Sequence, residues 1–67
     1  MAKLRCQSYF YDVVCTRETD SACYCEIDGD GYWIPKSQIH DDSEVYKKDT
    51  DGTLIISDWI AKEKGLK

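Results

Sequence analysis

The sequence of 67 residues lacks an apolar run of about 18 residues, the length that a membrane-spanning helix requires. The segment 1–7 also lacks the apolar stretch of a secretory signal peptide. We therefore expect a protein of the cytoplasm with no membrane partner. There is no internal repeat, and the only proline, Pro35, lies within a motif rather than a linker. This organisation predicts a single domain over 1–67.

Positive charge is scarce, because nine lysines and arginines stand against 13 aspartates and glutamates and leave a net charge of −4. A protein that binds duplex nucleic acid needs a basic surface to neutralise phosphates. The composition therefore argues against duplex nucleic acid as a partner. Lys47 and Lys48 interrupt the acidic segment 41–51, so we expect a solvated loop there, with an acidic face for a basic partner as the alternative.

The segment 4–14 is rich in aromatic and β-branched residues, which predicts a long or bent strand. Side chains alternate between the two faces of a strand. Tyr9, Tyr11 and Val13 are therefore expected on one face and Phe10 on the other, so that both faces carry apolar side chains.

A β-hairpin is predicted over 22–34. The segment 21–27 alternates as a strand does, and the glycines and aspartates of 28–31 tolerate the positive φ of a tight turn. An apolar run resumes at 32–34. Pro35 has no backbone N–H, so the second strand is expected to end there or to lie at the edge of a sheet.

The remaining predicted elements are short. The polar segment 16–20 predicts a turn, 45–46 a short strand and 53–56 the last strand. Ser57 or Asp58 can then cap a short helix, because their side-chain oxygens accept from backbone N–H groups of its first turn.

Within this helix, Trp59 and Ile60 are expected to face the sheet. Gly65 is placed to end the helix as the left-handed residue of a Schellman cap, with Leu66 folded back onto the helix. Together these elements predict an α+β fold, a small and twisted antiparallel sheet of three to five strands with one short C-terminal helix.

Three segments of the chain resemble small uncharacterised proteins encoded by bacteriophages and prophages. They are Glu18-Thr19-Asp20, Trp33-Ile34-Pro35-Lys36-Ser37-Gln38-Ile39 and Trp59-Ile60-Ala61-Lys62-Glu63-Lys64-Gly65-Leu66. The resemblance covers 18–67. It implies a phage origin and a compact α+β fold, and it implies no activity. The aromatic segment near the N-terminus lies outside it.

Four cysteines, Cys6, Cys15, Cys23 and Cys25, are the candidate metal ligands, because four thiolates complete a structural zinc site. Their spacing differs from the paired C-x-x-C knuckles of zinc ribbons and fingers. Cys23 and Cys25 should instead share one face of a strand, about 7 Å apart. His40, the only histidine, is the candidate replacement ligand and the only base for a cysteine nucleophile. We expect free, partly buried cysteines and no cofactor, with structural zinc as the alternative.

The eight aromatic residues, two Trp, five Tyr and one Phe, exceed what so small a core readily encloses. Tyr9, Tyr11, Tyr32 and Lys36 are the candidate binding residues. Tyrosines and tryptophans exposed beside Lys36 or Arg17 are typical of protein interfaces and of surfaces that stack single-stranded bases. The acidic balance favours a protein partner. A sheet edge left open by the first strand would also allow a homodimer.

These observations favour a non-enzymatic accessory protein of a phage or prophage that binds a host or phage protein in the bacterial cytoplasm. Inhibition of a host defence protein or a host enzyme is one form that this function takes. Two alternatives stay open, a small structural zinc protein and a single-stranded nucleic-acid binder. The partner itself is not encoded in any recognisable motif.

Overall fold

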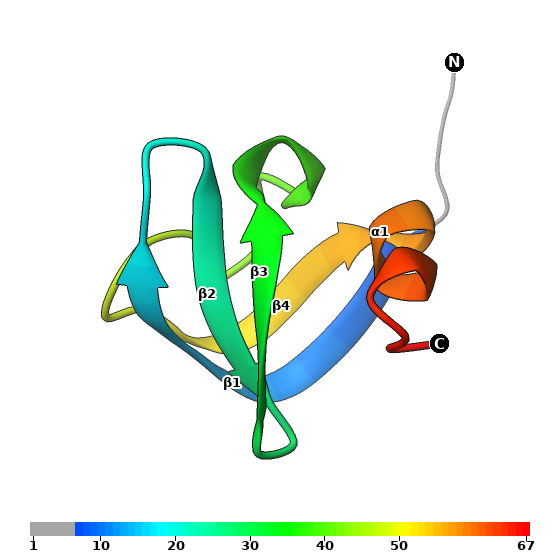
Figure 1. Ribbon diagram of the computed structural model, residues 1–67, viewed down its shortest axis with the longest axis horizontal. Helices are drawn as coiled ribbons and strands as arrows, with labels where there is room; N and C mark the ends of the chain where they lie inside the picture. The colour runs from blue at the N-terminus through cyan, green and yellow to red at the C-terminus, as the bar shows by residue number, and fades with distance from the viewer. Residues whose placement is uncertain (1–6) are drawn as a thin grey trace.

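The computed structural model describes residues 7–67, which form one antiparallel sheet and one short helix (Figure 1). The sheet has four strands in the order β3-β2-β1-β4, which confirms the predicted α+β fold. No helix in this part of the chain is long and apolar enough to cross a membrane. In chain order the elements are β1 (Gln7–Glu18), β2 (Ala22–Ile27), β3 (Asp30–Pro35), the 3-10 helix η1 (Lys36–Gln38), β4 (Asp51–Ser57) and α1 (Asp58–Glu63).

The core receives buried side chains from every strand, from the loop before β4 and from α1. Burying apolar side chains is the main force that stabilises such a small fold. The buried cluster consists of Val13, Cys15, Cys23, Cys25, Ile27, Ile34, Val45, Leu54, Ile56, Ile60 and Ala61.

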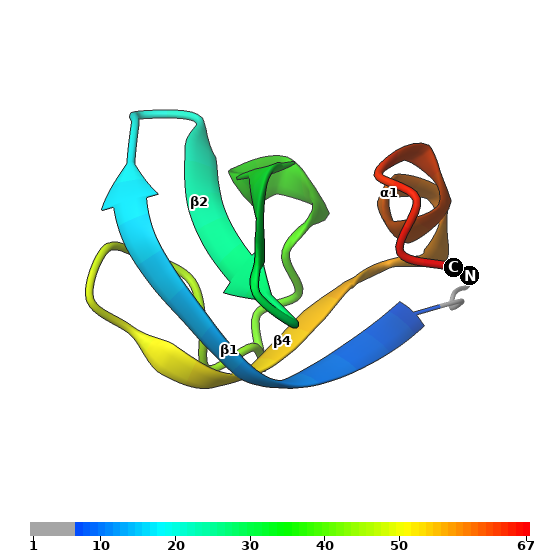
Figure 2. The same ribbon diagram turned by 60° about the horizontal axis from the view of Figure 1, so that its bottom comes forward.

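β1 is bent, so that its two halves pair with different neighbours (Figure 2). Residues 7–10 and 13–14 pair with β4, and residues 14–18 pair with β2, so the two ladders overlap only at Val14. The ladder with β4 is irregular between Phe10 and Val13, where Asp12 adopts a left-handed φ of 58°. An extra residue in one strand of an antiparallel pair bends that strand and increases its twist.

The same irregularity decides which side chains of β1 face the core. Tyr9 and Tyr11 are exposed, Phe10 is half-buried against the core, and Val13 is fully buried. The prediction that Val13 shares a face with the two tyrosines is therefore wrong. It assumed strict alternation, and the bulge shifts the alternation by one residue.

β1 lies inside the sheet, so the prediction of an open edge at the first strand is wrong. The two edge strands are β3 and β4. The loop before β4 covers the outer edge of that strand, through a bridge between Ile39 and Ile56 and a 2.8 Å hydrogen bond from the His40 N–H to the Ile55 carbonyl. The segment 45–46, predicted to be a strand, lies in this loop. β3 is therefore the edge that stays open.

The β2–β3 hairpin confirms the prediction for 22–34. A two-residue turn joins the strands, and both of its residues have positive φ, 52° at Asp28 and 87° at Gly29. Positive φ at both positions matches the right-handed twist of the flanking strands. β3 ends at Pro35, as expected. Upstream, β1 continues through part of the predicted turn at 16–20 and ends at Glu18.

α1 begins and ends as its sequence predicts. The Ser57 hydroxyl accepts a 3.3 Å hydrogen bond from the Ile60 N–H and caps the first turn. Gly65 adopts a φ of 76°, and the Leu66 N–H donates to the Ala61 carbonyl at 2.8 Å. This pattern is a Schellman cap. It folds Leu66 back onto the core.

Trp59 does not face the sheet, contrary to the prediction. It is 61% exposed, whereas Ile60 is 4% exposed and Ala61 is fully buried. Successive helical residues are rotated by about 100°, so a buried arc can include two neighbouring residues but not three in a row. The inward position belongs to Ile60 and Ala61, which leaves Trp59 in solvent.

Candidate functional site

Two aromatic side chains pack against each other on the outer face of the β2–β3 hairpin. Tyr24 and Trp33 are directly opposite in the ladder, with ring centroids 5.0 Å apart and ring planes tilted by 57°. Trp33 stays 40% exposed, whereas its neighbour Ile34 is fully buried. Alternation along the strand thus separates an aromatic outer face from an apolar inner face.

Arg17 of β1 extends this outer surface to a third strand. It is opposite Tyr24 in the β1–β2 ladder, and its guanidinium carbon lies 6.0 Å from the centre of the Tyr24 ring. A guanidinium over an aromatic face is a cation–π contact. We call the row of Arg17, Tyr24 and Trp33 the aromatic stripe. The sequence-based set of binding residues did not include it.

Carboxylates border the aromatic stripe on the side of the hairpin turn. Glu26 is on the outer face of β2, and Asp28 and Asp30 are at the turn, all three exposed. Within residues 7–67, none of these carboxylates lies within ion-pair distance of a basic side chain. In the described part of the chain, the one side-chain hydrogen bond to these carboxylates is a 3.4 Å contact from the Thr16 hydroxyl to Glu26. This border is therefore negatively charged.

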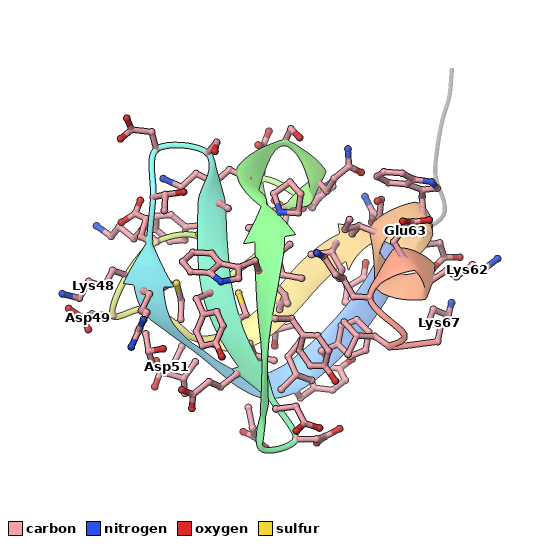
Figure 3. The ribbon with its side chains drawn as sticks, viewed as in Figure 1. Lys48, Asp49, Asp51, Lys62, Glu63 and Lys67 are labelled. Atoms are coloured by element: carbon pink, nitrogen blue, oxygen red, sulfur yellow. The ribbon has the colours of Figure 1, made fainter. Side chains whose placement is uncertain are left out.

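The acidic border continues onto β1 and β4. Val14 is 40% exposed and is opposite Glu26 on one side and Asp51 on the other. A shallow hollow of about 250 Å³ lies here, lined by Asp12, Val13, Val14, Asp51 and Gly52. Figure 3 shows Lys62 and Lys67 beside α1, at the opposite end of the molecule from Asp51.

The outer edge of β3 has backbone groups that lack partners. The Lys36 N–H donates to the Ser21 carbonyl at 2.8 Å, so Lys36 and Ser21 form a hydrogen-bonded pair next to the β2–β3 ladder. This bond shows which residues of β3 are hydrogen-bonded to β2. Bonded pairs recur at every second residue of an antiparallel ladder. The even-numbered residues of β3 therefore direct their backbone groups toward β2, and Gly31 and Trp33 direct theirs outward. Among the described residues, no backbone bond outside the ladder uses Gly31 or Trp33.

Lys36, a predicted binding residue, forms an ion pair with Glu18 of β1. Glu18 also accepts a 3.2 Å hydrogen bond from the Lys48 N–H. The bond to Lys36 is the main reason that the pKa of Glu18 is lowered, and the reciprocal bond raises the pKa of Lys36. Glu18 therefore ties β1 to η1 through Lys36 and to the loop before β4 through Lys48.

The three predicted tyrosines lie in two places. Tyr9 and Tyr11 are on β1 and are 53% and 70% exposed. Tyr32 is on β3 and packs against the core beside the inward side chains of the hairpin. No side-chain hydrogen bond or ion pair within residues 7–67 joins these tyrosines to each other or to Lys36. Their role in binding stays a prediction.

Cys15, Cys23 and Cys25 are free thiols and are fully buried, and Cys6 lies outside the described residues. Cys15 and Cys25 are directly opposite in the β1–β2 ladder. Burial, followed by the proximity of Cys15, raises the pKa of Cys23 to about 11 and that of Cys25 to about 12. Cys23 and Cys25 therefore stay protonated at neutral pH, which suits apolar packing better than metal ligation or nucleophilic attack.

The thiols of Cys15, Cys23 and Cys25 donate to backbone carbonyls, and none of the three is bonded to His40. The Nδ1 of His40 accepts a 3.0 Å hydrogen bond from the Asp42 N–H in the exposed loop. In the part of the chain that the structure describes, no group of three or more His, Cys, Asp or Glu side chains is arranged to hold a metal ion. A zinc site built from Cys15, Cys23, Cys25 and His40 has no geometric support there.

The segment after β3 connects the two edges of the sheet. Pro35 ends β3, η1 turns the chain, and Ile39 reaches β4. Two shallow hollows, of about 280 and 230 Å³, flank Ile39, His40 and Asp41. At one of them, the Ser57 hydroxyl donates a 2.6 Å hydrogen bond to Gln38. Ser37, Ser57 and His40 line the larger hollow, but within residues 7–67 no side-chain hydrogen bond joins either serine to His40, so the segment is best explained as a structural connection.

A scan against protein-family models, a search of curated proteins and a search of solved structures each give no match to this chain.

Proposed function

We propose that this chain is a non-enzymatic protein-interaction module, and that it acts as a phage or prophage accessory protein in the bacterial cytoplasm. Its partner is a host or phage protein. The aromatic stripe beside an acidic border is the observation that supports this proposal. Aromatic residues and arginine are enriched in protein interfaces, where a few of them supply most of the binding energy.

A non-enzymatic role is supported by the chemistry of the candidate nucleophiles. The pKa values of Cys23 and Cys25 are raised by burial, and neither thiol is bonded to His40. A cysteine nucleophile needs an adjacent base or an electropositive surrounding that lowers its pKa. Neither requirement is met at these two thiols.

A single-stranded nucleic acid is the less favoured occupant of the aromatic stripe. Bases stack on exposed aromatic rings, but the phosphates that join them need basic side chains nearby. The stripe contains one arginine, Arg17, and the border beside it carries Glu26, Asp28 and Asp30. Repulsion between phosphates and these carboxylates therefore favours a protein.

The proposal is tested by affinity capture from bacterial lysate with three forms of the chain, wild type, Trp33→Ala and Trp59→Ala. Trp59→Ala is the matched control, because Trp59 is more exposed but lies on α1, away from the stripe. We expect a specific protein to be retained by wild type and Trp59→Ala and lost by Trp33→Ala. Retention of no protein in repeated gentle captures, or equal retention by all three forms, would contradict the proposal.

Native mass spectrometry under reducing conditions tests the zinc alternative directly. Our proposal predicts a metal-free chain with four free thiols. One zinc ion per chain would instead show that the cysteines form a metal site, which would make the N-terminal half of the chain a structural zinc centre. Titration with an oligonucleotide, followed by tryptophan fluorescence, tests the other alternative, and salt-dependent quenching would support it.

A further inference from the structure

We infer that the open edge of β3 accepts an extended, basic segment of a partner protein as a fifth, antiparallel strand. This inference rests on the proposed function and specifies the chemistry of the partner. Extended segments commonly bind by adding a strand to an exposed sheet edge, where main-chain bonds give affinity and alternate side chains give specificity.

The backbone of β3 supplies the main-chain part of this binding. Gly31 and Trp33 each direct an N–H and a C=O outward, and both residues are exposed. A strand laid along this edge would satisfy all four groups. Pro35, the next outward residue, has no N–H to donate. The paired stretch therefore ends between Trp33 and Pro35, which limits the docked segment to the end of β3 nearest the hairpin turn.

The side chains along this edge favour a cation. A residue of the docked strand opposite Trp33 would lie beside an indole that is 40% exposed. Arg17 already shows how a guanidinium rests on the neighbouring ring, with its carbon 6.0 Å from the Tyr24 centroid. The carboxylates of Asp28 and Asp30 lie at the end of β3 where pairing is open, and no basic side chain among residues 7–67 neutralises them.

A second copy of the chain fits this edge less well. Between Asp30 and Pro35, β3 contains an acidic residue and no lysine or arginine, so it cannot supply the cation that the edge favours. Two chains that each carry a net charge of −4 also repel one another. Charge complementarity therefore points to a basic segment of another protein.

Three synthetic peptides of about eight residues, the length of an ordinary strand, test the inference. The first alternates arginine and valine, the second alternates glutamate and valine, and the third is the arginine peptide with the backbone nitrogen of each arginine methylated, because an arginine opposite Trp33 directs its N–H toward β3. Fluorescence anisotropy measures binding, and amide NMR spectra locate it on the protein. The third peptide keeps the charge of the first but cannot donate the main-chain bonds.

We expect the arginine peptide to bind and to shift the amide signals of Gly31 and Trp33 most. Loss of two main-chain hydrogen bonds in the methylated peptide should weaken binding by about tenfold or more. The glutamate peptide should bind at least about tenfold more weakly, because its charges repel the acidic border. Trp33→Ala should weaken binding of the arginine peptide, and Trp59→Ala should leave it unchanged.

Several outcomes would overturn strand addition. Equal binding of the methylated and unmethylated arginine peptides would show that charge alone holds them. Amide shifts centred away from β3 would place the site elsewhere. Concentration-dependent shifts of Gly31 and Trp33 without any peptide would assign the edge to a second copy, and the same shifts with an oligonucleotide would assign it to nucleic acid.

The two proposals fail in different ways. If no peptide binds at β3 but the lysate capture still depends on Trp33, the chain binds a protein through its outer face without strand addition. If neither experiment depends on Trp33, both proposals are wrong.

Discussion

The two faces of the β2–β3 hairpin differ although they come from alternate residues of the same two strands. The inner face carries Cys23, Cys25 and Ile34, all fully buried. The outer face carries Tyr24 and Trp33, which pair with each other and remain partly in solvent. Because side chains of a strand alternate, one hairpin can stabilise the fold with one face and present the other to a partner.

Substitutions on the two faces of the hairpin should therefore change different properties of the protein. On the inner face, removing side-chain atoms leaves a cavity in the core and lowers the free energy of unfolding. On the outer face, a lost ring removes contact area that solvent can largely replace. Stability and binding should therefore respond to neighbouring positions in the sequence, Ile34 and Trp33, in opposite ways.

Ile34→Ala should have the largest effect. It removes a fully buried side chain from the centre of the hairpin, and such truncations cost about 2–5 kcal/mol. A domain of this size rarely has more than about 3–5 kcal/mol of stability, so much of the protein should be unfolded. Urea unfolding followed by circular dichroism measures the loss. A change below about 1 kcal/mol would show that the inner face of the hairpin does not hold the fold together.

Raising the pH should cause the next largest loss of stability, because the inner face of the hairpin buries thiols. Their ordinary pKa is 9.0, and the folded values are raised to about 11 for Cys23 and about 12 for Cys25. Above pH 9 the unfolded chain therefore releases these protons while the folded chain retains them, so stability is complete below pH 9 and falls as the pH rises toward 12.

Urea unfolding at a series of pH values under reducing conditions measures this fall. Cys25→Ala is the control, because it removes one of the two thiols and should make the fall between pH 9 and 12 shallower, even though the variant starts less stable. An identical slope for the variant and the wild type would contradict burial of Cys25 as the cause.

Trp33→Ala should have a small effect on stability, about 1 kcal/mol, because it breaks one cross-strand aromatic pair on a partly exposed surface. Its effect on binding should be much larger. Comparing the urea midpoint with the affinity for the arginine peptide separates the two. A loss of stability as large as that of Ile34→Ala would show that the outer face stabilises the fold as much as the inner face does.

Arg17→Ala should have the smallest effect, about 0.5 kcal/mol, because an exposed cation–π contact is weak. It should also leave the β3 edge more negative, since it removes the one cation of the aromatic stripe. Affinity for the arginine peptide should therefore stay the same or increase. A large decrease would contradict the electrostatic explanation of binding at this edge, because removal of a cation should not weaken binding of a cationic peptide.

Much of the fold could be predicted from local chemistry. The positive-φ turn at Asp28 and Gly29, the break at Pro35, and the caps at Ser57 and Gly65 all act through residues next to one another. Each of these predictions is confirmed. Local signals of this kind need no knowledge of the rest of the chain.

The errors arose where distant parts of the chain decide the outcome. The bulge at Asp12 depends on pairing with β4, about 40 residues away, and it reversed the expected position of Val13. Trp59 is exposed because Ile60 and Ala61 pack into the core instead, and this choice depends on how α1 is placed on the sheet. The position of β1 inside the sheet likewise depends on β4 pairing with it.

The aromatic stripe could have been found in part. A two-residue turn at Asp28 and Gly29 fixes the hairpin register, and this register places Tyr24 opposite Trp33. The position of Arg17 could not be found that way, because it depends on the irregularity between Cys15 and Arg17 in the β1–β2 ladder. The open edge of β3 required the order of all four strands.

Amide hydrogen exchange, measured residue by residue along β3, shows whether this edge of the sheet is open. An open edge predicts alternation, with slow exchange at Tyr32 and Ile34, which bond to β2, and fast exchange at Gly31 and Trp33, whose amides point outward. Equally slow exchange at all four amides would show that the edge of β3 is already covered and would contradict the account.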